Sequence, residues 1–280
     1  MNLEWGENLP GADTLKAEVD AMLDAWVEVL LGHIPAQEIA GIYFKGSAHK
    51  AWHSPLDYVP ELSDVDIHVL FRRHDDAGRR LGSLPEAMAI RRAVEQHYRA
   101  KIPTPVHVPR PQLTILNDLL EQPEYVPSPP KTVAVLHGEP YPCAGPSDPD
   151  ILREIDRRKL LDTRDSEDLK RLPLRLVDKP GDYAAGCLRG LSWMVSPTGP
   201  RALSVLGRRF EEAWSLNRTG IVGRLTKMGQ YQLADQYAAF YLAGWDWFLS
   251  AYTDDESLRA AVTAGRRAID LGATLAEKHH

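Results

Sequence analysis

Apolar residues recur along the chain at two spacings, one typical of helices and the other of strands. Residues 14–31 carry an apolar side chain every three or four positions, which predicts an amphipathic helix (Leu15, Val19, Met22, Trp26 and Leu30). Residues 40–45 and 64–71 are short runs rich in β-branched and aromatic side chains, as strands are. Residues 104–108 and 131–136 have the same character, so the first half of the chain is predicted to alternate helices and strands.

Two capping boxes predict where further helices begin. Ser83-Leu-Pro-Glu86 places a proline in the first turn and is expected to open a helix that runs to about Tyr98. Thr253-Asp-Asp-Glu256 is a second capping box, from which a last helix is expected to run towards Ala276. After residue 148 the spacing of apolar residues is almost wholly helical.

Two proline-rich stretches, at residues 122–130 and 138–146, interrupt this pattern. Proline lacks a backbone donor and fixes φ, so neither stretch is expected to be a helix or a central strand. We therefore predict an α/β domain over residues 1–145 and an α-helical domain over residues 146–280.

The composition argues against nucleic-acid and membrane partners and favours a cytoplasmic location. Hydrophobic residues make up 44% of the 280 residues, charged residues make up 26%, and the formal net charge of −6 argues against a large phosphate-binding surface for nucleic acid. The most apolar stretch, residues 237–252, contains Asp246 and is too short to span a bilayer, so no membrane partner is expected. Cys143 and Cys187 are too few for a disulfide framework, and no leader pattern opens the chain, which together predict a cytoplasmic protein.

The candidate chemistry lies in the second predicted strand, Asp64-Val-Asp-Ile-His-Val69. Side chains alternate along a strand, so Asp64 and Asp66 are expected on one face with His68, and the intervening valines and isoleucine on the core face. The two aspartates would then lie about 7 Å apart at Cα, close enough for both carboxylates to bind the same cation. Magnesium suits such a pair because it takes one or two carboxylates and completes its coordination with phosphate oxygens.

The residues after the first predicted strand supply a candidate phosphate site. Glycine at position 46 lets the backbone approach a phosphate closely, and the hydroxyl and N–H groups of Ser47 are hydrogen-bond donors for its oxygens. Lys45, the last residue of the strand, is a further candidate for binding nucleotide phosphates.

This order of a strand, Gly-Ser, a spacer and Asp-x-Asp on the next strand resembles the core of the DNA polymerase beta-type nucleotidyltransferase superfamily over about residues 35–140. The resemblance implies that Asp64 and Asp66 bind two magnesium ions, and that Gly46 and Ser47 contact phosphate. A small domain of this kind followed by a helical domain is similar in layout to the aminoglycoside adenylyltransferases. The resemblance implies an α+β fold, in which a nucleotidyltransferase domain with a mixed sheet (residues 1–145) precedes an α-helical bundle (residues 146–280).

Two features depart from that superfamily. The spacer between Ser47 and Asp64 has 16 residues, which is longer than usual. The family also has a third carboxylate on a later strand, whereas the predicted strand at residues 104–108 presents His107. His107 is therefore a candidate general base, since a histidine near its ordinary pKa can accept a hydroxyl proton. Asp118 and Glu121, on an expected short helix, are alternative acids.

The function that the resemblance implies is transfer of a nucleoside monophosphate from ATP or another nucleoside triphosphate to a hydroxyl of a small-molecule acceptor, with release of pyrophosphate. Asp64, Asp66 and His107 would be its catalytic residues. The missing third acid favours an alternative, a catalytically silent nucleotide-binding regulator or antitoxin on the same fold. A polymerase or tRNA-modifying enzyme is a third possibility, which the acidic balance disfavours.

Overall fold

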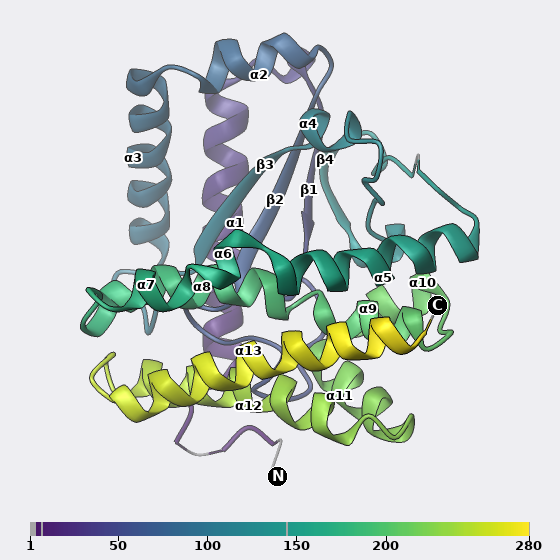
Figure 1. Ribbon diagram of the computed structural model, residues 1–280. Helices are drawn as coiled ribbons and strands as arrows, with labels where there is room; N and C mark the ends of the chain where they lie inside the picture. The colour runs from purple at the N-terminus through teal and green to yellow at the C-terminus, as the bar shows by residue number, and fades with distance from the viewer. Residues whose placement is uncertain (1–3, 7, 144, 280) are drawn as a thin grey trace. The chain divides into compact units, whose positions relative to one another are not determined.

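The computed structural model describes residues 4–6, 8–143 and 145–279 (Figure 1). The outermost residues of the two predicted domains (1–3 and 280) and residue 144 of the second proline-rich stretch lie outside the described residues. The described chain has an α+β fold with one four-stranded mixed sheet and a larger set of helices.

The chain divides into two compact units. The sheet unit holds Trp5–Lys50 and Asp64–Gly145, and the helical unit holds Ala51–Ser63 and the chain from Pro146 on. The division into domains at residues 1–145 and 146–280 stays a prediction, and the compact units differ from it in grouping Ala51–Ser63 with the helices that follow Pro146.

The sheet has the strand order β3-β2-β1-β4. Its central strands, β1 (Ile39–Lys45) and β2 (Asp64–Phe71), pair antiparallel and confirm the predicted strands at residues 40–45 and 64–71. On the outer edges, β4 (Ala134–Gly138) pairs antiparallel with β1, and β3 (Arg110–Ile115) pairs parallel with β2. A parallel neighbour needs a crossover, which α2 (His74–Leu81) and α3 (Leu84–Lys101) provide.

The prediction of a strand at residues 104–108 is wrong. Pro103, Pro105 and Pro109 each lack a backbone donor, and residues 104–108 form a loop that precedes the edge strand β3. The predicted strand at residues 131–136 begins later, as β4, because the prolines before it lead into a 3-10 turn, η2 (Pro130–Thr132).

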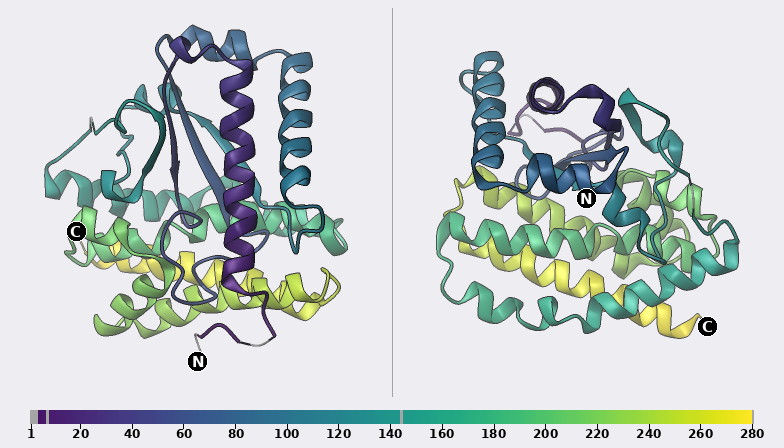
Figure 2. Two further views of the ribbon diagram at one scale, coloured as in Figure 1. Left: turned by 180° about the vertical axis from the view of Figure 1, so that it is seen from behind. Right: turned by 90° about the horizontal axis from the view of Figure 1, so that it is seen from above.

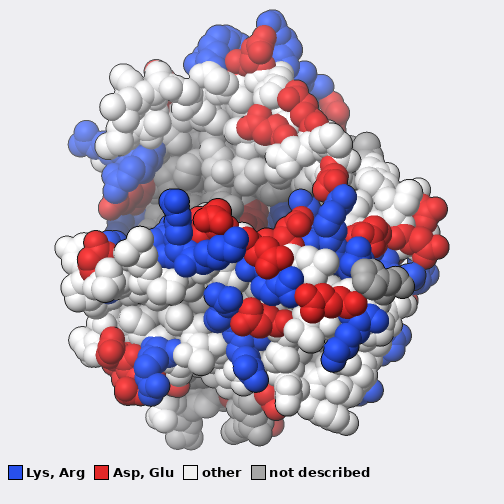
Figure 3. All heavy atoms as spheres, viewed as in Figure 1, with Lys and Arg blue, Asp and Glu red and all other residues white. Residues whose placement is uncertain are grey.

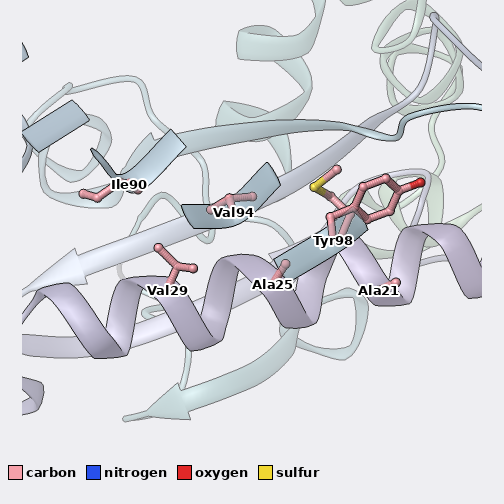
Figure 4. Packing of buried hydrophobic residues seen from close by; sticks show 7 residues of the cluster. Ala21, Ala25, Val29, Ile90, Val94 and Tyr98 are labelled. Carbon is pink, nitrogen blue, oxygen red and sulfur yellow. The ribbon is translucent and has the colours of Figure 1, made fainter. Parts of the chain in front are cut away.

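One face of the sheet is covered by two long helices. Val65, Ile67 and Val69 of β2 are fully buried, as the alternation predicts, and α1 (Ala12–His33) packs against this strand. The helices α1 and α3 lie side by side (Figure 2) and share an apolar cluster (Figure 4), made of Ala21, Met22, Ala25, Val29, Ile90, Val94 and Tyr98. The predicted cap of α3 is confirmed, because the Ser83 hydroxyl accepts a hydrogen bond from the Glu86 backbone.

The remaining elements of the sheet unit are short. A 3-10 turn, η1 (Ala36–Glu38), leads into β1, and α4 (Leu116–Leu120) follows β3. Asn117 of α4 accepts from the Phe71 backbone N–H and donates to the Phe71 carbonyl, which fixes α4 to the last residue of β2.

The helical unit is built around a pair of long helices, α12 (Tyr231–Leu249) and α13 (Asp255–Lys278), which pack against each other. Gly265 permits this close approach, because a Cβ there would collide with Leu191 and Phe240. The cap of α13 is Asp254 and not the predicted Thr253, a shift of one residue. The other elements surround this pair: α5 (Pro149–Asp165), α6 (Glu167–Lys170), α7 (Leu172–Leu176), η3 (Gly181–Ala184), α8 (Ala185–Val195), α9 (Thr198–Val205), α10 (Phe210–Ser215) and α11 (Arg218–Lys227).

Residues 51–63, which make up most of the long spacer of the sequence motif, belong to the helical unit, and we call them the 51–63 segment. The indole N–H of Trp245 donates to the Pro55 carbonyl over 2.8 Å, and the Ser192 hydroxyl donates to the Leu62 carbonyl over 2.8 Å. Gly244 of α12 leaves room for the Leu62 side chain, which a Cβ at that position would strike. The segment is therefore part of the helical core.

Two charged side chains hold the 51–63 segment to α11. The buried Asp57 carboxylate accepts from the Thr219 backbone N–H (2.9 Å) and hydroxyl (2.7 Å), at the start of that helix. The buried Arg218 donates to the Leu56 carbonyl (3.1 Å) and to the Ser63 hydroxyl (2.9 Å). Charge-assisted hydrogen bonds of buried side chains such as these fix the segment against the helix.

The outer face of the helical unit carries charges of both signs. Acidic and basic side chains are intermingled there (Figure 3), and many pair within one helix, as Arg157 does with Glu154 and Arg266 with Asp270. Among the helices of the described residues, none is long and apolar enough to cross a membrane.

Candidate functional site

Asp64 is the first residue of β2 and is held by an arginine from the neighbouring strand. The parallel register places Asp64 opposite Arg110, the first residue of β3, and the two side chains form an ion pair. The Asp64 side chain is 7% exposed and the Arg110 side chain 26% exposed, so the arginine is the more exposed member of this pair. A buried carboxylate needs such a partner.

Asp66 lies on the same strand face and meets the turn after β1. Lys45 is its partner in the antiparallel register, and Gly46 follows directly with a φ of 84°. A Cβ at position 46 would collide with the Asp66 carboxylate, so glycine is required there both for its conformation and for its size. The structure thus brings the two predicted halves of the site together.

Ser47 occupies the next position of this turn. The turn is closed by a hydrogen bond from the Lys50 backbone N–H to the Gly46 carbonyl over 3.3 Å, and Ser47 is half-buried in it. Lys45, Gly46, Ser47, Asp64 and Asp66 therefore all lie within one small region of the sheet unit.

Further along β2, the same face becomes apolar. His68 is buried, and its Nδ1 lies 3.5 Å from the hydroxyl of Tyr141, which packs edge-on against Tyr43. Burial, and to a smaller degree the charge of Lys45, lowers the pKa of His68 to about 3. A histidine in this environment is neutral at physiological pH and part of the packing.

The neighbouring strand does not supply a third acid. Arg110 lies opposite Asp64, and Gln112 lies opposite Asp66. Within the described residues, no three histidine, cysteine, aspartate or glutamate side chains come together as a metal-binding group. The candidate site is therefore a pair of carboxylates bordered by an arginine and an amide.

His107 lies outside this strand face, in the loop before β3. Its Nδ1 is 2.6 Å from a carboxylate oxygen of Glu18 in α1, and both side chains are 3% exposed. Burial opposes the ionisation of Glu18, but hydrogen bonds from His107 and Val106 outweigh it and hold the pKa of Glu18 below its ordinary value. His107 thus fastens the loop to α1, and its predicted role as general base stays a prediction.

The alternative acids Asp118 and Glu121 lie at the other end of β2 from Asp64. Both bind the imidazole of His74, with Asp118 at 2.5 Å from Nε2 and Glu121 at 2.8 Å from Nδ1. All three side chains are exposed, at the start of α2 and the end of α4. Neither acid is placed to complete the pair of Asp64 and Asp66.

Arg110 is the site residue that the sequence reasoning missed. The available signal was the alternation of Arg110, Gln112 and Thr114, which puts three polar side chains on one face of a strand that starts after Pro109. Placing the strand at residues 104–108 hid that signal.

Comparison of the chain with protein-family models, with curated proteins and with solved structures gives no match.

Proposed function

We propose that the protein is a magnesium-dependent nucleotidyltransferase with a polymerase beta-like sheet domain. It would transfer a nucleoside monophosphate from ATP or another nucleoside triphosphate to a hydroxyl of a small-molecule acceptor, and release pyrophosphate. One observation carries the proposal: Asp64 and Asp66 share a strand face, and the Gly46 turn is pressed against the Asp66 carboxylate.

The donor set fits magnesium. Two carboxylates on one strand face offer the hard oxygen ligands that Mg²⁺ prefers, and phosphate oxygens and water complete its octahedron. Asp64 and Asp66 would hold the ion, which would neutralise the charge of the bound triphosphate and stabilise charge that develops on transfer.

The turn after β1 would bind the phosphates. Gly46 has a positive φ and lies against the Asp66 carboxylate, and Ser47 follows at once with a hydroxyl and an N–H that would donate to phosphate oxygens. Lys45, paired with Asp66 in the register, adds a positive charge at this edge. Donors and a cation on either side of a triphosphate favour phosphoryl transfer.

A specific observation favours a second candidate, a silent nucleotide-binding regulator. Where a third acid would assist deprotonation of the acceptor, β3 presents Arg110 and Gln112, and His107 is bound to Glu18. Such a site would bind nucleotide without transferring it.

Pyrophosphate release separates the two candidates. Wild-type protein with magnesium, ATP, GTP, CTP or UTP and a panel of hydroxyl acceptors should release pyrophosphate, and Asp66→Asn should not, because an amide offers the cation no charge. A silent regulator would show a nucleotide-dependent rise of melting temperature but no pyrophosphate with any acceptor.

A further inference from the structure

Arg110 brings a fixed positive charge to the carboxylate pair. It lies opposite Asp64 in adjacent parallel strands and forms an ion pair with the Asp64 side chain. The charges of Asp64 and Asp66 sum to −2, and those of Arg110 and Lys45 sum to +2, so the four side chains are formally neutral together. A neutral cluster has little attraction for a pair of divalent cations without a bound anion.

The two carboxylates are not equivalent as ligands. Asp64 is buried and already neutralised by Arg110, whereas Asp66 is half-buried, beside the glycine turn. A cation that binds Asp64 must compete with a guanidinium, which is a strong, geometrically matched partner for a carboxylate.

The guanidinium is also a suitable ligand for phosphate. Arginine binds phosphate oxygens through paired N–H donors, and the Arg110 side chain is more exposed than the aspartate it neutralises. Arg110 lies opposite Asp64 and two residues before Gln112, the register partner of Asp66, so it is beside the region that we assign to the triphosphate.

We propose that Arg110 takes the place of a second metal ion: the site holds one magnesium ion, and the guanidinium supplies the second positive charge on the triphosphate. This inference rests on the proposed nucleotide site and deepens it. It requires that Arg110 oppose metal binding in the free protein and favour nucleotide binding in the complex.

The variant Arg110→Gln removes this charge. It should raise the affinity for metal in the free protein and lower the affinity for nucleotide in the presence of metal. Without nucleotide, it should bind Mn²⁺, a spectroscopic substitute for magnesium, several-fold more tightly, because the competitor for Asp64 is gone. With Mn²⁺ present, it should bind a non-hydrolysable ATP analogue about tenfold more weakly, because a charge-assisted phosphate contact is lost. Arg110→Lys, which keeps the charge, should retain much of the analogue affinity.

Arg72→Gln is the matched control. Arg72 lies in the same unit and pairs with the exposed Glu139, away from the carboxylate pair, so its removal should leave both affinities unchanged. A purely structural role for Arg110 would weaken both kinds of binding in Arg110→Gln, and that result would overturn the proposal.

The number of bound metal ions per chain tests the proposal independently. Electron paramagnetic resonance of Mn²⁺ with the wild-type protein and the saturating ATP analogue should give one bound ion per chain. Two ions per chain would overturn the role of Arg110 while leaving the nucleotide site intact. Absence of analogue binding in wild type and variants alike would overturn the proposed function itself, and this inference with it.

Discussion

Glu18 and His107 form a buried pair that fixes the loop before β3. Glu18 accepts from the backbone of Val106 at 2.5 Å as well as from the His107 side chain, and the Tyr98 hydroxyl donates to the His107 carbonyl over 3.1 Å. The loop before β3 is thus fixed to α1 and α3. The start of β3, and with it Arg110, depends on this anchor.

His107→Ala should therefore lower the free energy of unfolding by about 3 kcal/mol, because the buried Glu18 carboxylate loses its side-chain partner and keeps only backbone donors. Urea unfolding monitored by circular dichroism measures this loss. The sequence-based hypothesis of a general base predicts instead a loss of turnover of about a hundredfold at unchanged stability. That outcome would contradict the structural role.

The burial of His68 predicts a pH dependence of the free energy of unfolding. Its pKa is about 3 in the folded protein, against about 6.5 in an unfolded chain, so the unfolded state binds the proton first as the pH falls. Its contribution to stability is complete above about pH 6.5 and declines below it, by about 2 kcal/mol at pH 5. The variant His68→Phe should lack this part of the pH dependence.

Urea unfolding at a series of pH values from 5 to 8 tests this, with His97→Gln as the control because His97 is exposed on α3. Parallel pH profiles for wild type and His68→Phe would show that the folded protein does not exclude the proton from His68.

At the scale of elements, the outcome for each strand follows from its residues. Strands β1 and β2 were predictable, because apolar side chains alternate or run without a break between turn residues. Strand β3 was misplaced because its polar, proline-containing sequence, Arg110–Ile115, is tolerated only at a sheet edge, and edge position is a property of the assembled sheet. The pair of Asp64 and Asp66 followed from alternation, whereas the partner of Asp64 depended on the register of β3.

The contact of the 51–63 segment with α11 is expected to stabilise the fold, mainly through Asp57. Asp57 accepts hydrogen bonds from the backbone of His53, Ser54 and Thr219, from the Thr219 hydroxyl and from the Asn217 side-chain amide. Asp57→Ala would remove the buried acceptor of all these donors, so it should cost about 3 kcal/mol of unfolding free energy. The exposed cap Asp148→Ala, at the start of α5, should cost only about 1 kcal/mol.

Chemical denaturation of the two variants gives the comparison directly. Equal and small losses would mean that Asp57 is an ordinary surface cap and that the segment is held by other contacts.

At the scale of the whole molecule, the helical unit is discontinuous in sequence. Its core includes the 51–63 segment, whose Pro55 and Leu62 carbonyls accept from Trp245 and Ser192. No local pattern predicts this, since the segment looks like a loop in the sequence and gains its structure from residues more than a hundred positions away. The spacer is longer than in the superfamily that the sequence resembles, and its residues 51–63 form part of the core of the helical unit.

A fragment of residues 146–280 should therefore not fold on its own, because Trp245, Ser192 and Arg218 would lose their buried partners. Circular dichroism melting of the isolated fragment should show no cooperative transition. A cooperative transition near that of the whole protein would show that the 51–63 segment contributes little to this core.

We propose that the strand face of Asp64 and Asp66 binds a magnesium–nucleotide complex, and the melting temperature with and without these ligands is the measurement that tests this binding. Magnesium and ATP together should raise the melting temperature of wild-type protein by more than the sum of their separate effects, because each completes the binding site of the other. In Asp66→Asn this cooperative part should vanish, while Arg72→Gln should keep it. An unchanged cooperative shift in Asp66→Asn would contradict binding of the magnesium–nucleotide complex at this strand face.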